Sequence, residues 1–214
     1  MPDQQTVAQR RKARQVEAAR EDILNAAAAA FARSGYRAAT MQEIAKEAGF
    51  TAASLYTYFE SKVAIYQALR TVIVEETFSH FDSHHSGTFE EKLTTLLTNT
   101  LSVADSRKDA FVFLMSLASG EEAAPRDAGR KPKRGHDGYI AAIEMWFGNN
   151  ATPADLGGVE AETSALLLHG LVHAYFRRWL RDKGCVPLGQ HAPEIARFFL
   201  RGVQGTAGER IGVA

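Results

Sequence analysis

The stretch from Arg20 to Leu69 constrains the fold most, because capping residues divide it into short helices at definite places. Thr40 is followed three residues later by Glu43. This is the pattern of a capping box, in which the hydroxyl accepts from the third helical amide and the carboxylate accepts from the cap amide. Gly49 follows at a position that favours left-handed backbone, and Thr51 then caps the next helix. The stretch therefore predicts a helix-turn-helix, whose second helix fits a DNA major groove.

This stretch resembles the N-terminal domain of the TetR family of bacterial transcriptional regulators. The residues that carry the resemblance are Ile23-Leu24, Ala26-Ala27, Phe31, Gly35, Thr40-Met41, Ile44-Ala45, Ala48-Gly49, Leu55-Tyr56, Tyr58-Phe59 and Ser61-Lys62. The other residues match only in helical character. The resemblance implies an all-α protein, with a three-helix helix-turn-helix DNA-binding domain followed by a helical-bundle domain for ligand binding and dimerisation.

The composition is compatible with this fold and limits the cellular location. The net charge is zero, but residues 1–70 carry ten Lys/Arg against seven Asp/Glu, which gives weak support to a DNA-facing first part. The single cysteine, Cys185, excludes an intrachain disulfide framework. No apolar run reaches membrane-spanning length, and no signal-peptide pattern opens the chain. We therefore expect a cytoplasmic protein.

The order of helical and polar segments predicts the domain boundaries. The first helix is expected to run from about Arg14 to Arg33, with Gly35 ending it. Basic residues before it either belong to a solvated extension of this helix or contact DNA phosphates or a minor groove. The expected parts are a basic disordered arm at 1–13, a DNA-binding domain at 14–66, a ligand-binding and dimerisation domain at 67–206 and a tail at 207–214.

The helix at 52–58 is the candidate recognition helix. It offers no charged side chain to base edges, so Arg or Lys cannot read guanine from it; Thr and Ala can instead contact thymine methyl groups. The chain departs here from the family's usual residues at Ala52, Thr57 and Val63. The resemblance implies phosphate contacts from Thr40, Tyr56 and Lys62, and a half-buried packing role is the alternative for Tyr56. The predicted DNA-binding residues are Arg11, Arg14, Arg37, Thr40, Thr51, Ala52, Ala53, Ser54, Tyr56, Thr57 and Lys62.

The second half of the chain reads as further helices. Thr88 and Glu91 form another capping box, and a long helix from about Val159 to Asp182 is apolar on more than one face. Pro193 starts a last helix. The resemblance implies that the last two long helices form a four-helix bundle with a second subunit. The predicted dimer interface consists of Leu171, Tyr175, Trp179, Ile195, Phe198 and Phe199.

Four helices of this half carry more apolar residues than one slim core needs, which predicts a pocket for a small apolar or aromatic effector. The alternative is that these residues pack together. His169 and His173 share a helix face but lack a third metal ligand, so we expect neither a metal nor another cofactor. The predicted ligand-binding residues are Leu97, Leu101, Phe111, Met115, Ile143, Trp146, His169, Val172 and His173, with Leu168, Asn99 and Glu144 beside them.

Two polar breaks between helices also contain residues that could bind a metal or DNA. His84-His85 fits a solvated loop pair better than a pair of metal ligands. The break at 120–138 contains Arg130, Lys131, Lys133 and Arg134, which fit a surface loop better than a second DNA contact.

These patterns together predict a ligand-responsive, sequence-specific DNA-binding transcriptional regulator. We expect a homodimeric repressor that a small-molecule effector releases from a palindromic double-stranded operator. The alternative is a helical adaptor that binds a protein partner through its C-terminal domain. The sequence has no Glu-x-x-His pair, activated nucleophile pattern or glycine-rich phosphate loop, so we expect no enzymatic activity.

Overall fold

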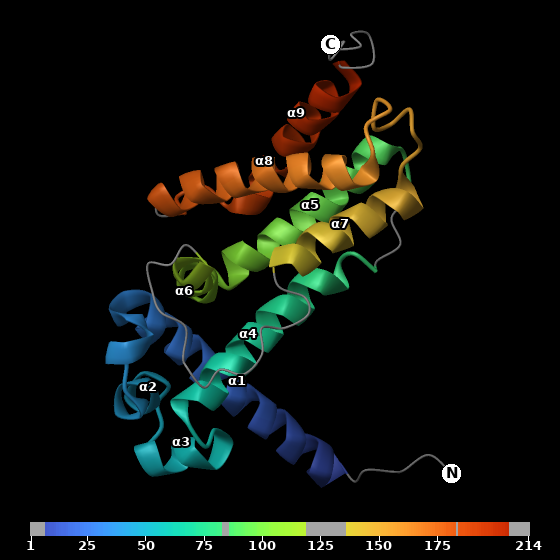
Figure 1. Cartoon of the computed structure of the whole chain (residues 1–214). Helices are drawn as coiled ribbons and strands as arrows, with labels where there is room; N and C mark the ends of the chain where they lie inside the picture. Colours follow the sequence, from blue (N-terminus) through green and yellow to red (C-terminus); the bar gives the residue numbers. More distant parts are fainter. Residues whose placement is uncertain (1–6, 83–85, 119–135, 183, 206–214) are drawn as a thin grey trace. The chain divides into compact units, whose positions relative to one another are not determined.

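The computed structural model describes residues 7–82, 86–118, 136–182 and 184–205, and these residues form helices without any strand (Figure 1). The predicted all-α fold is therefore confirmed. In chain order the helices are α1 (Val7–Ala38), α2 (Met41–Glu47), α3 (Ala52–Tyr58), α4 (Lys62–Ser79), α5 (Phe89–Ser106), α6 (Lys108–Ala118), α7 (His136–Asn150), α8 (Ala161–Arg181), the short 3-10 helix η1 (Leu188–His191) and α9 (Ala192–Gly205).

The described residues divide into two compact units. The first unit contains residues 7–73 and 107–118, and the second contains residues 74–82, 86–106, 136–182 and 184–205. Helix α4 therefore contributes to both units. Helix α6 belongs to the first unit, although the sequence placed it in the C-terminal domain. The domain boundary predicted at 66/67 remains a prediction.

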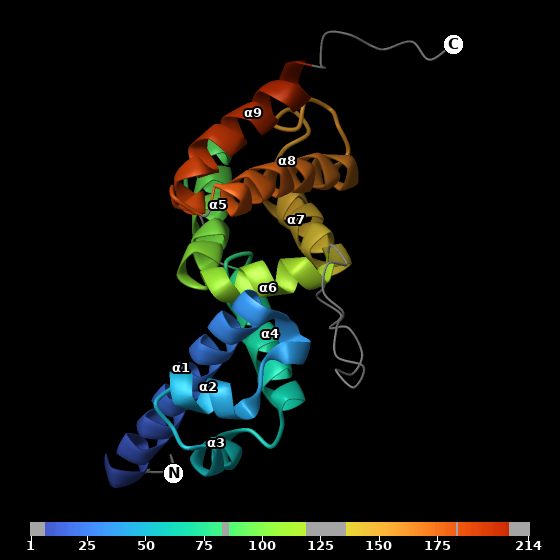
Figure 2. The same ribbon diagram turned by 90° about the vertical axis from the view of Figure 1, so that its left-hand side faces the viewer.

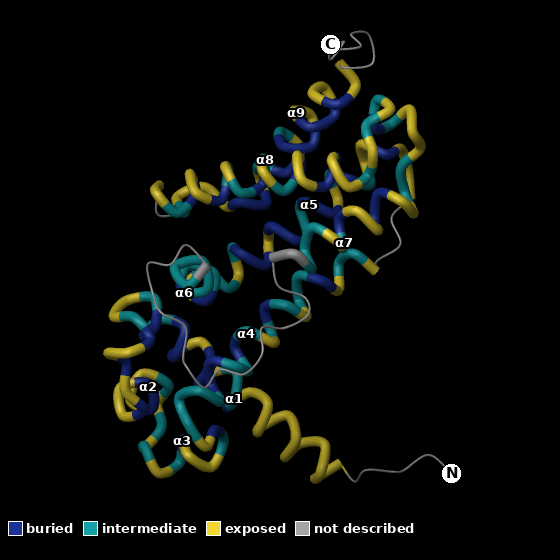
Figure 3. The backbone as a smooth tube through the Cα atoms, in the orientation of Figure 1, coloured by how far each residue is buried: buried dark blue, intermediate teal, exposed yellow. Residues whose placement is uncertain are grey.

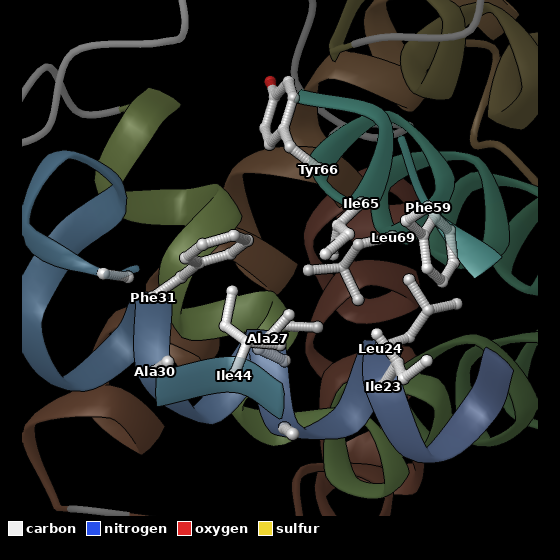
Figure 4. Close-up of a cluster of buried hydrophobic side chains, with 14 of the residues drawn as sticks. Ile23, Leu24, Ala27, Ala30, Phe31, Ile44, Phe59, Ile65, Tyr66 and Leu69 are labelled. Atoms are coloured by element: carbon white, nitrogen blue, oxygen red, sulfur yellow. The ribbon is translucent and has the colours of Figure 1, made fainter. Parts of the chain in front are cut away.

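The first unit is built around α1, whose apolar side is buried against α2, α3, the start of α4 and α6. Figure 4 shows Phe31 of α1, Ile44 of α2, and Ile65 and Leu69 of α4 in one buried cluster. Phe113 of α6 completes it, with its ring centroid 4.9 Å from that of Phe31. Helix α6, whose sequence KDAFVFLMSLA is largely apolar, therefore covers the core of the first unit.

Helix α1 begins earlier than the sequence predicted. It begins at Val7, so residues 7–13 are helical rather than a disordered arm, and residues 7–18 are all exposed (Figure 3). At the other end the long helix stops at Gly35, as the sequence predicts, because the backbone of Gly35 is non-helical (φ 79°, ψ 159°); a short helical turn follows up to Ala38. Residues 1–6 of the predicted arm lie outside the described residues.

The second unit packs α5 against α9 and α7 against α8 (Figure 2). The rings of Phe147 in α7 and Phe199 in α9 are stacked with centroids 5.5 Å apart. The Asp105 carboxylate at the end of α5 accepts hydrogen bonds from the amides of Leu188 and Gly189, at 2.7 and 2.9 Å. These bonds satisfy the first amides of η1 and hold it against α5.

Several predicted features fall outside the described residues. They are His84-His85, the basic cluster from Arg130 to Arg134, and the tail at 207–214. Among the helices that the structure describes, none combines the length and apolar character needed to cross a bilayer.

Candidate nucleic-acid interface

Helix α2 opens with the capping box that the sequence predicts. The Thr40 hydroxyl accepts from the Glu43 amide at 3.2 Å and donates to the Glu43 carboxylate at 3.0 Å, while the Thr40 amide donates to the same carboxylate at 2.9 Å. The Thr40 amide, and next the Thr40 hydroxyl, hold the pKa of Glu43 below its ordinary value because both stabilise the ionised form. The Thr40 hydroxyl thus donates its hydrogen to the Glu43 carboxylate and does not offer it to a DNA phosphate in this arrangement. The phosphate contact that the resemblance implies for Thr40 remains a prediction.

We expect Glu43→Gln to flatten the pH dependence of stability in the first unit. The wild-type carboxylate, with its lowered folded pKa, contributes stability that is fully present above the unfolded pKa near 4.5 and is lost as pH falls through the folded value. Glutamine can accept the same bonds but does not titrate. Hydrogen exchange of α2 amides between about pH 6 and pH 3 should show a loss of protection in the wild type that the variant lacks. Equal losses in both proteins would show that this carboxylate is not the titrating group.

The turn between α2 and α3 follows the predicted local geometry. Gly49 has φ 77°, and the Phe50 amide donates to the Ala45 carbonyl at 2.8 Å, which ends α2. Thr51 then accepts the Ser54 amide at 3.1 Å as the N-cap of α3. These caps hold two helices of seven residues each in place, although neither is long enough to be stable alone.

Burial of Leu55 orients α3. Leu55 is fully buried, whereas Ala53, Tyr56 and Thr57 are exposed on the other side of the helix. Tyr56 is 49% exposed, so it can reach a phosphate but also fits the alternative of a half-buried packing residue, and its role remains a prediction. Ala52 and Ser54 are of intermediate exposure and flank this row. The exposed side of α3 is therefore the side that the sequence predicts for the groove.

Arg20 of α1 closes the C-terminal end of α3, a role that the sequence did not reveal. Its guanidinium donates to the Tyr58 carbonyl at 2.8 Å and lies 4.1 Å from the centre of the Phe59 ring. A cation at this end satisfies a carbonyl that has no partner within the helix and offsets the negative end of the helix dipole. Its position over the ring adds a cation–π contact. Arg20 thus holds the C-terminal end of α3 against α1.

Lys62 has a comparable role at the other end of the motif. Its ammonium donates to the carbonyls of Tyr36 and Ala39, each at 2.6 Å, and to that of Arg37 at 3.2 Å. It also lies 4.5 Å from the centre of the Tyr36 ring. An ammonium has three N–H donors, and all three have acceptors here. Lys62 therefore ties the start of α4 to the end of α1, and the predicted phosphate contact would require it to leave part of this arrangement.

The other predicted basic contacts lie on the surface of α1. Arg11 and Arg14 are exposed in its N-terminal part, and Arg37 is exposed in its last turn. Arg33, which the sequence did not single out, pairs with Glu47 of α2 at 2.9 Å between exposed side chains. This pair adds little stability because water screens it.

The predicted effector residues are divided between the two units. Leu97, Leu101, Ile143, Trp146, Leu168 and Val172 are buried in the second unit. Phe111 and Met115 lie half-buried on α6 of the first unit, and Phe111 packs against the core of that unit. The rings of His169 and His173 are stacked with centroids 6.0 Å apart, and the Tyr139 ring lies 5.9 Å from His169. Loss of water around its hydroxyl raises the pKa of Tyr139 to about 12.

The predicted dimer interface needs a correction. Trp179, Ile195 and Phe199 are only 4%, 0% and 2% exposed within their own chain, so they offer no surface to a second copy. Phe198 is 53% exposed, and Leu171 and Tyr175 are of intermediate exposure. Leu166 and Leu167 of α8, which the sequence assigned to no interface, are each 51% exposed.

Comparison with known proteins agrees with the geometry of the first unit. The family described as bacterial regulatory proteins, tetR family, matches residues 23–69. A relative, the uncharacterized HTH-type transcriptional regulator YdgC of Bacillus subtilis (strain 168), is 48% identical over 52 residues, or 24% of this chain. That match spans only 27% of the relative's length.

Solved structures extend the likeness to most of the chain. NalD, the secondary repressor of the MexAB-OprM multidrug efflux pump in Pseudomonas aeruginosa, has a TM-score of 0.63 at 19% identity, covering 89% of this chain and 98% of NalD. A TetR-family transcriptional regulator from Bordetella parapertussis 12822 has a TM-score of 0.65 at 22% identity, and the match covers 85% of this chain and 93% of that regulator. FadR of Bacillus subtilis, in complex with stearoyl-CoA, has a TM-score of 0.59 at 16% identity, and the match covers 86% of this chain and 98% of FadR. The chain therefore has the all-helical fold of TetR-family transcriptional regulators and carries that family's helix-turn-helix domain at residues 23–69.

Proposed function

We propose that the protein is a homodimeric repressor that leaves a palindromic operator when a small apolar or aromatic effector binds to it. The observation that carries this proposal is the geometry of α3, which is capped at both ends and exposes Ala53, Tyr56 and Thr57 on one side. Two copies of such a helix enter successive major grooves when they stand about 34–36 Å apart. A palindromic site follows from the two-fold symmetry of the pair.

Exposed apolar side chains on α8 and α9 support the dimer. Leu166, Leu167 and Phe198 are each about half exposed, on two helices that contact each other. Large apolar side chains mark an interaction site where they join into one exposed patch, which is what the dimer proposal requires of these three. A second copy of the chain is the occupant that would also supply the second recognition helix.

The effector proposal draws support from the indole N–H of Trp146, one of several buried polar groups for which the described residues supply no hydrogen-bond partner. Trp146 is 2% exposed, and its indole N–H has no hydrogen-bond partner within the described part of the chain. Such a group costs free energy unless a partner arrives. A largely apolar molecule with one acceptor atom would supply that partner. Its preference for one of two dimer geometries would then lower operator affinity.

The proposal is tested by selecting duplexes from a random library with the purified full-length chain. We expect an enriched palindrome whose two half-sites lie about one helical turn apart, bound with a steep salt dependence. The protein should bind one half-site alone much more weakly. If no sequence is enriched, or if binding does not respond to salt, the repressor proposal fails and the adaptor alternative gains support.

We expect effector binding to change the fluorescence of Trp146. The chain has two tryptophans, Trp146 and Trp179, and both are buried. A panel of fatty acids, acyl-CoA thioesters and small aromatic compounds would be titrated into the protein with selected operator present. An active compound should change the fluorescence and release DNA over the same concentration range. The signal should persist in Trp179→Phe and disappear in Trp146→Phe; release of DNA by a compound that leaves the Trp179→Phe signal unchanged would place the effector elsewhere.

A further inference from the structure

The hydroxyl of Thr57 is used inside its own helix. Its oxygen donates a hydrogen bond to the Ser54 carbonyl at 2.7 Å, one turn earlier in α3. The hydroxyl proton is therefore committed to the backbone. The side chain, which is exposed, still offers a methyl group and an oxygen lone pair to an approaching base.

The neighbours of Thr57 make this side of α3 a row of methyl groups. Ala53 is exposed and lies four residues earlier, so it shares the face of Thr57. The helix as a whole reads AASLYTY and has no charged or amide side chain. It therefore lacks the groups that form bidentate hydrogen bonds with guanine or adenine.

Only one base edge in the major groove offers a matching apolar group. Thymine carries a methyl group at C5, whereas the other bases present hydrogen-bond donors and acceptors alone. We propose that α3 reads thymine methyl groups through the methyls of Thr57 and Ala53, so that the operator positions facing them are T·A pairs selected by apolar contact. This inference rests on the proposed function, because it assigns what the recognition helix reads in the operator.

A rival use of Thr57 makes the opposite prediction. Its oxygen keeps both lone pairs and is able to accept from the amino group of adenine or cytosine. In that case the oxygen, and not the methyl group, would carry the sequence preference. Two substitutions separate these roles: Thr57→Val keeps the methyl and removes the oxygen, and Thr57→Ser keeps the oxygen and removes the methyl.

The test uses full-length protein and the duplex selected from the random library. Thymines are replaced one at a time by uracil, which removes the C5 methyl and keeps every hydrogen-bonding group. We expect about fourfold weaker binding for each contacted methyl, from the apolar area that is no longer buried. Thr57→Ser should abolish the uracil penalty at one position in each half-site, whereas Thr57→Val should retain it. Ala53→Gly should abolish the penalty at a different position.

A second substitution in the DNA checks the same contact from the other side. When cytosine replaces the contacted thymine, 5-methylcytosine should bind more tightly than cytosine, because its methyl group lies in the same place. Uracil substitution outside the contacted positions should have no effect. Circular dichroism and thermal unfolding of each variant show whether α3 remains folded.

The outcomes separate the inference from the function on which it rests. A selected operator that is indifferent to uracil at every position overturns methyl readout and leaves the repressor proposal standing. If the position facing Thr57 shows no uracil penalty, and the preference for its base pair survives in Thr57→Ser but disappears in Thr57→Val, the contact belongs to the oxygen and the role of the Thr57 methyl is overturned. If the library yields no enriched duplex, the proposed function itself fails, and methyl readout fails with it.

Discussion

A Phe198→Asp variant is expected to remain folded, to sediment as a monomer and to lose its affinity for the palindromic operator. Phe198 is 53% exposed within its own chain, so a charge there stays in water in the isolated protomer. In the proposed interface the same charge would have to be desolvated without a partner, at a cost of about 3–5 kcal/mol. Sedimentation velocity gives the mass, and thermal unfolding shows whether the protomer fold persists.

The adjacent residue provides a matched control. Phe199 is 2% exposed and its ring is stacked on Phe147, so Phe199→Asp puts the same charge into the core of the second unit. That variant should unfold the second unit rather than separate two folded copies. A well-folded dimer of Phe198→Asp would remove this side of α9 from the interface.

Lys62→Met is expected to loosen the helix-turn-helix and to weaken binding to all DNA sequences alike. The substitution leaves the carbonyls of Tyr36, Arg37 and Ala39 without their shared donor. Hydrogen bonds to a charged group contribute about 1.5–3 kcal/mol each, but Lys62 is only half-buried and water replaces part of the loss. We expect a net loss of about 2 kcal/mol, measured by hydrogen exchange of α2 and α3 amides.

The salt dependence of DNA binding tells the two roles of Lys62 apart. Removing a phosphate contact lowers the slope of log affinity against log salt by about one, whereas removing a structural contact leaves the slope unchanged. Lys46→Met, at an exposed lysine of α2, serves as the control for the loss of a charge. If Lys62→Met lowers the slope and leaves amide protection intact, the phosphate contact predicted from the sequence is right.

Arg20→Met should produce a similar loosening at the C-terminal end of α3. It frees the Tyr58 carbonyl and uncovers the Phe59 ring. Because Arg20 and Lys62 bind different carbonyls and different rings, the effects of the two substitutions should be close to additive. Protection should fall first at the α3 amides in Arg20→Met.

The features that could be predicted from the sequence are those decided within a few residues. Thr40, Thr51 and Thr88 cap the helices that follow them, and each hydroxyl binds an amide three residues later. Gly49 adopts the left-handed conformation that a helix end of this kind favours. In each of these contacts the two partners are only a few residues apart, so both can be identified in the sequence without knowing the fold.

The contacts that could not be predicted join residues far apart in the chain. Arg20 binds a carbonyl 38 residues later, and Lys62 binds one 26 residues earlier. In the sequence Arg20 was assigned no role and Lys62 was assigned a phosphate contact, because only the fold brings the helix ends to these two cations. The extension of α1 to Val7 was only one of the alternatives that the sequence left open, because residues 7–18 bury no apolar side and their sequence shows no helical stripe.

The dimer residues show a further limit. A helix that is apolar on two sides shows that both sides are covered, but not which side the chain covers by itself. Phe198 and Phe199 are adjacent and chemically identical, yet one is exposed and the other is buried. Only the packing of α9 against α5 and α7 decides between them.

The return of α6 to the first unit has a consequence for protein synthesis. Residues 7–73 leave the ribosome well before α6, but Ala110 and Phe113 are part of the core around Phe31. The nascent helix-turn-helix therefore lacks one wall of its core until α5 and most of α6 have been translated. A fragment that stops before residue 107, whether from an early stop codon or from a protease, would hold every residue that we propose to read bases but an unfinished core. We expect such a fragment to compete poorly for the proposed operator, so that an interrupted chain interferes little with its intact copies.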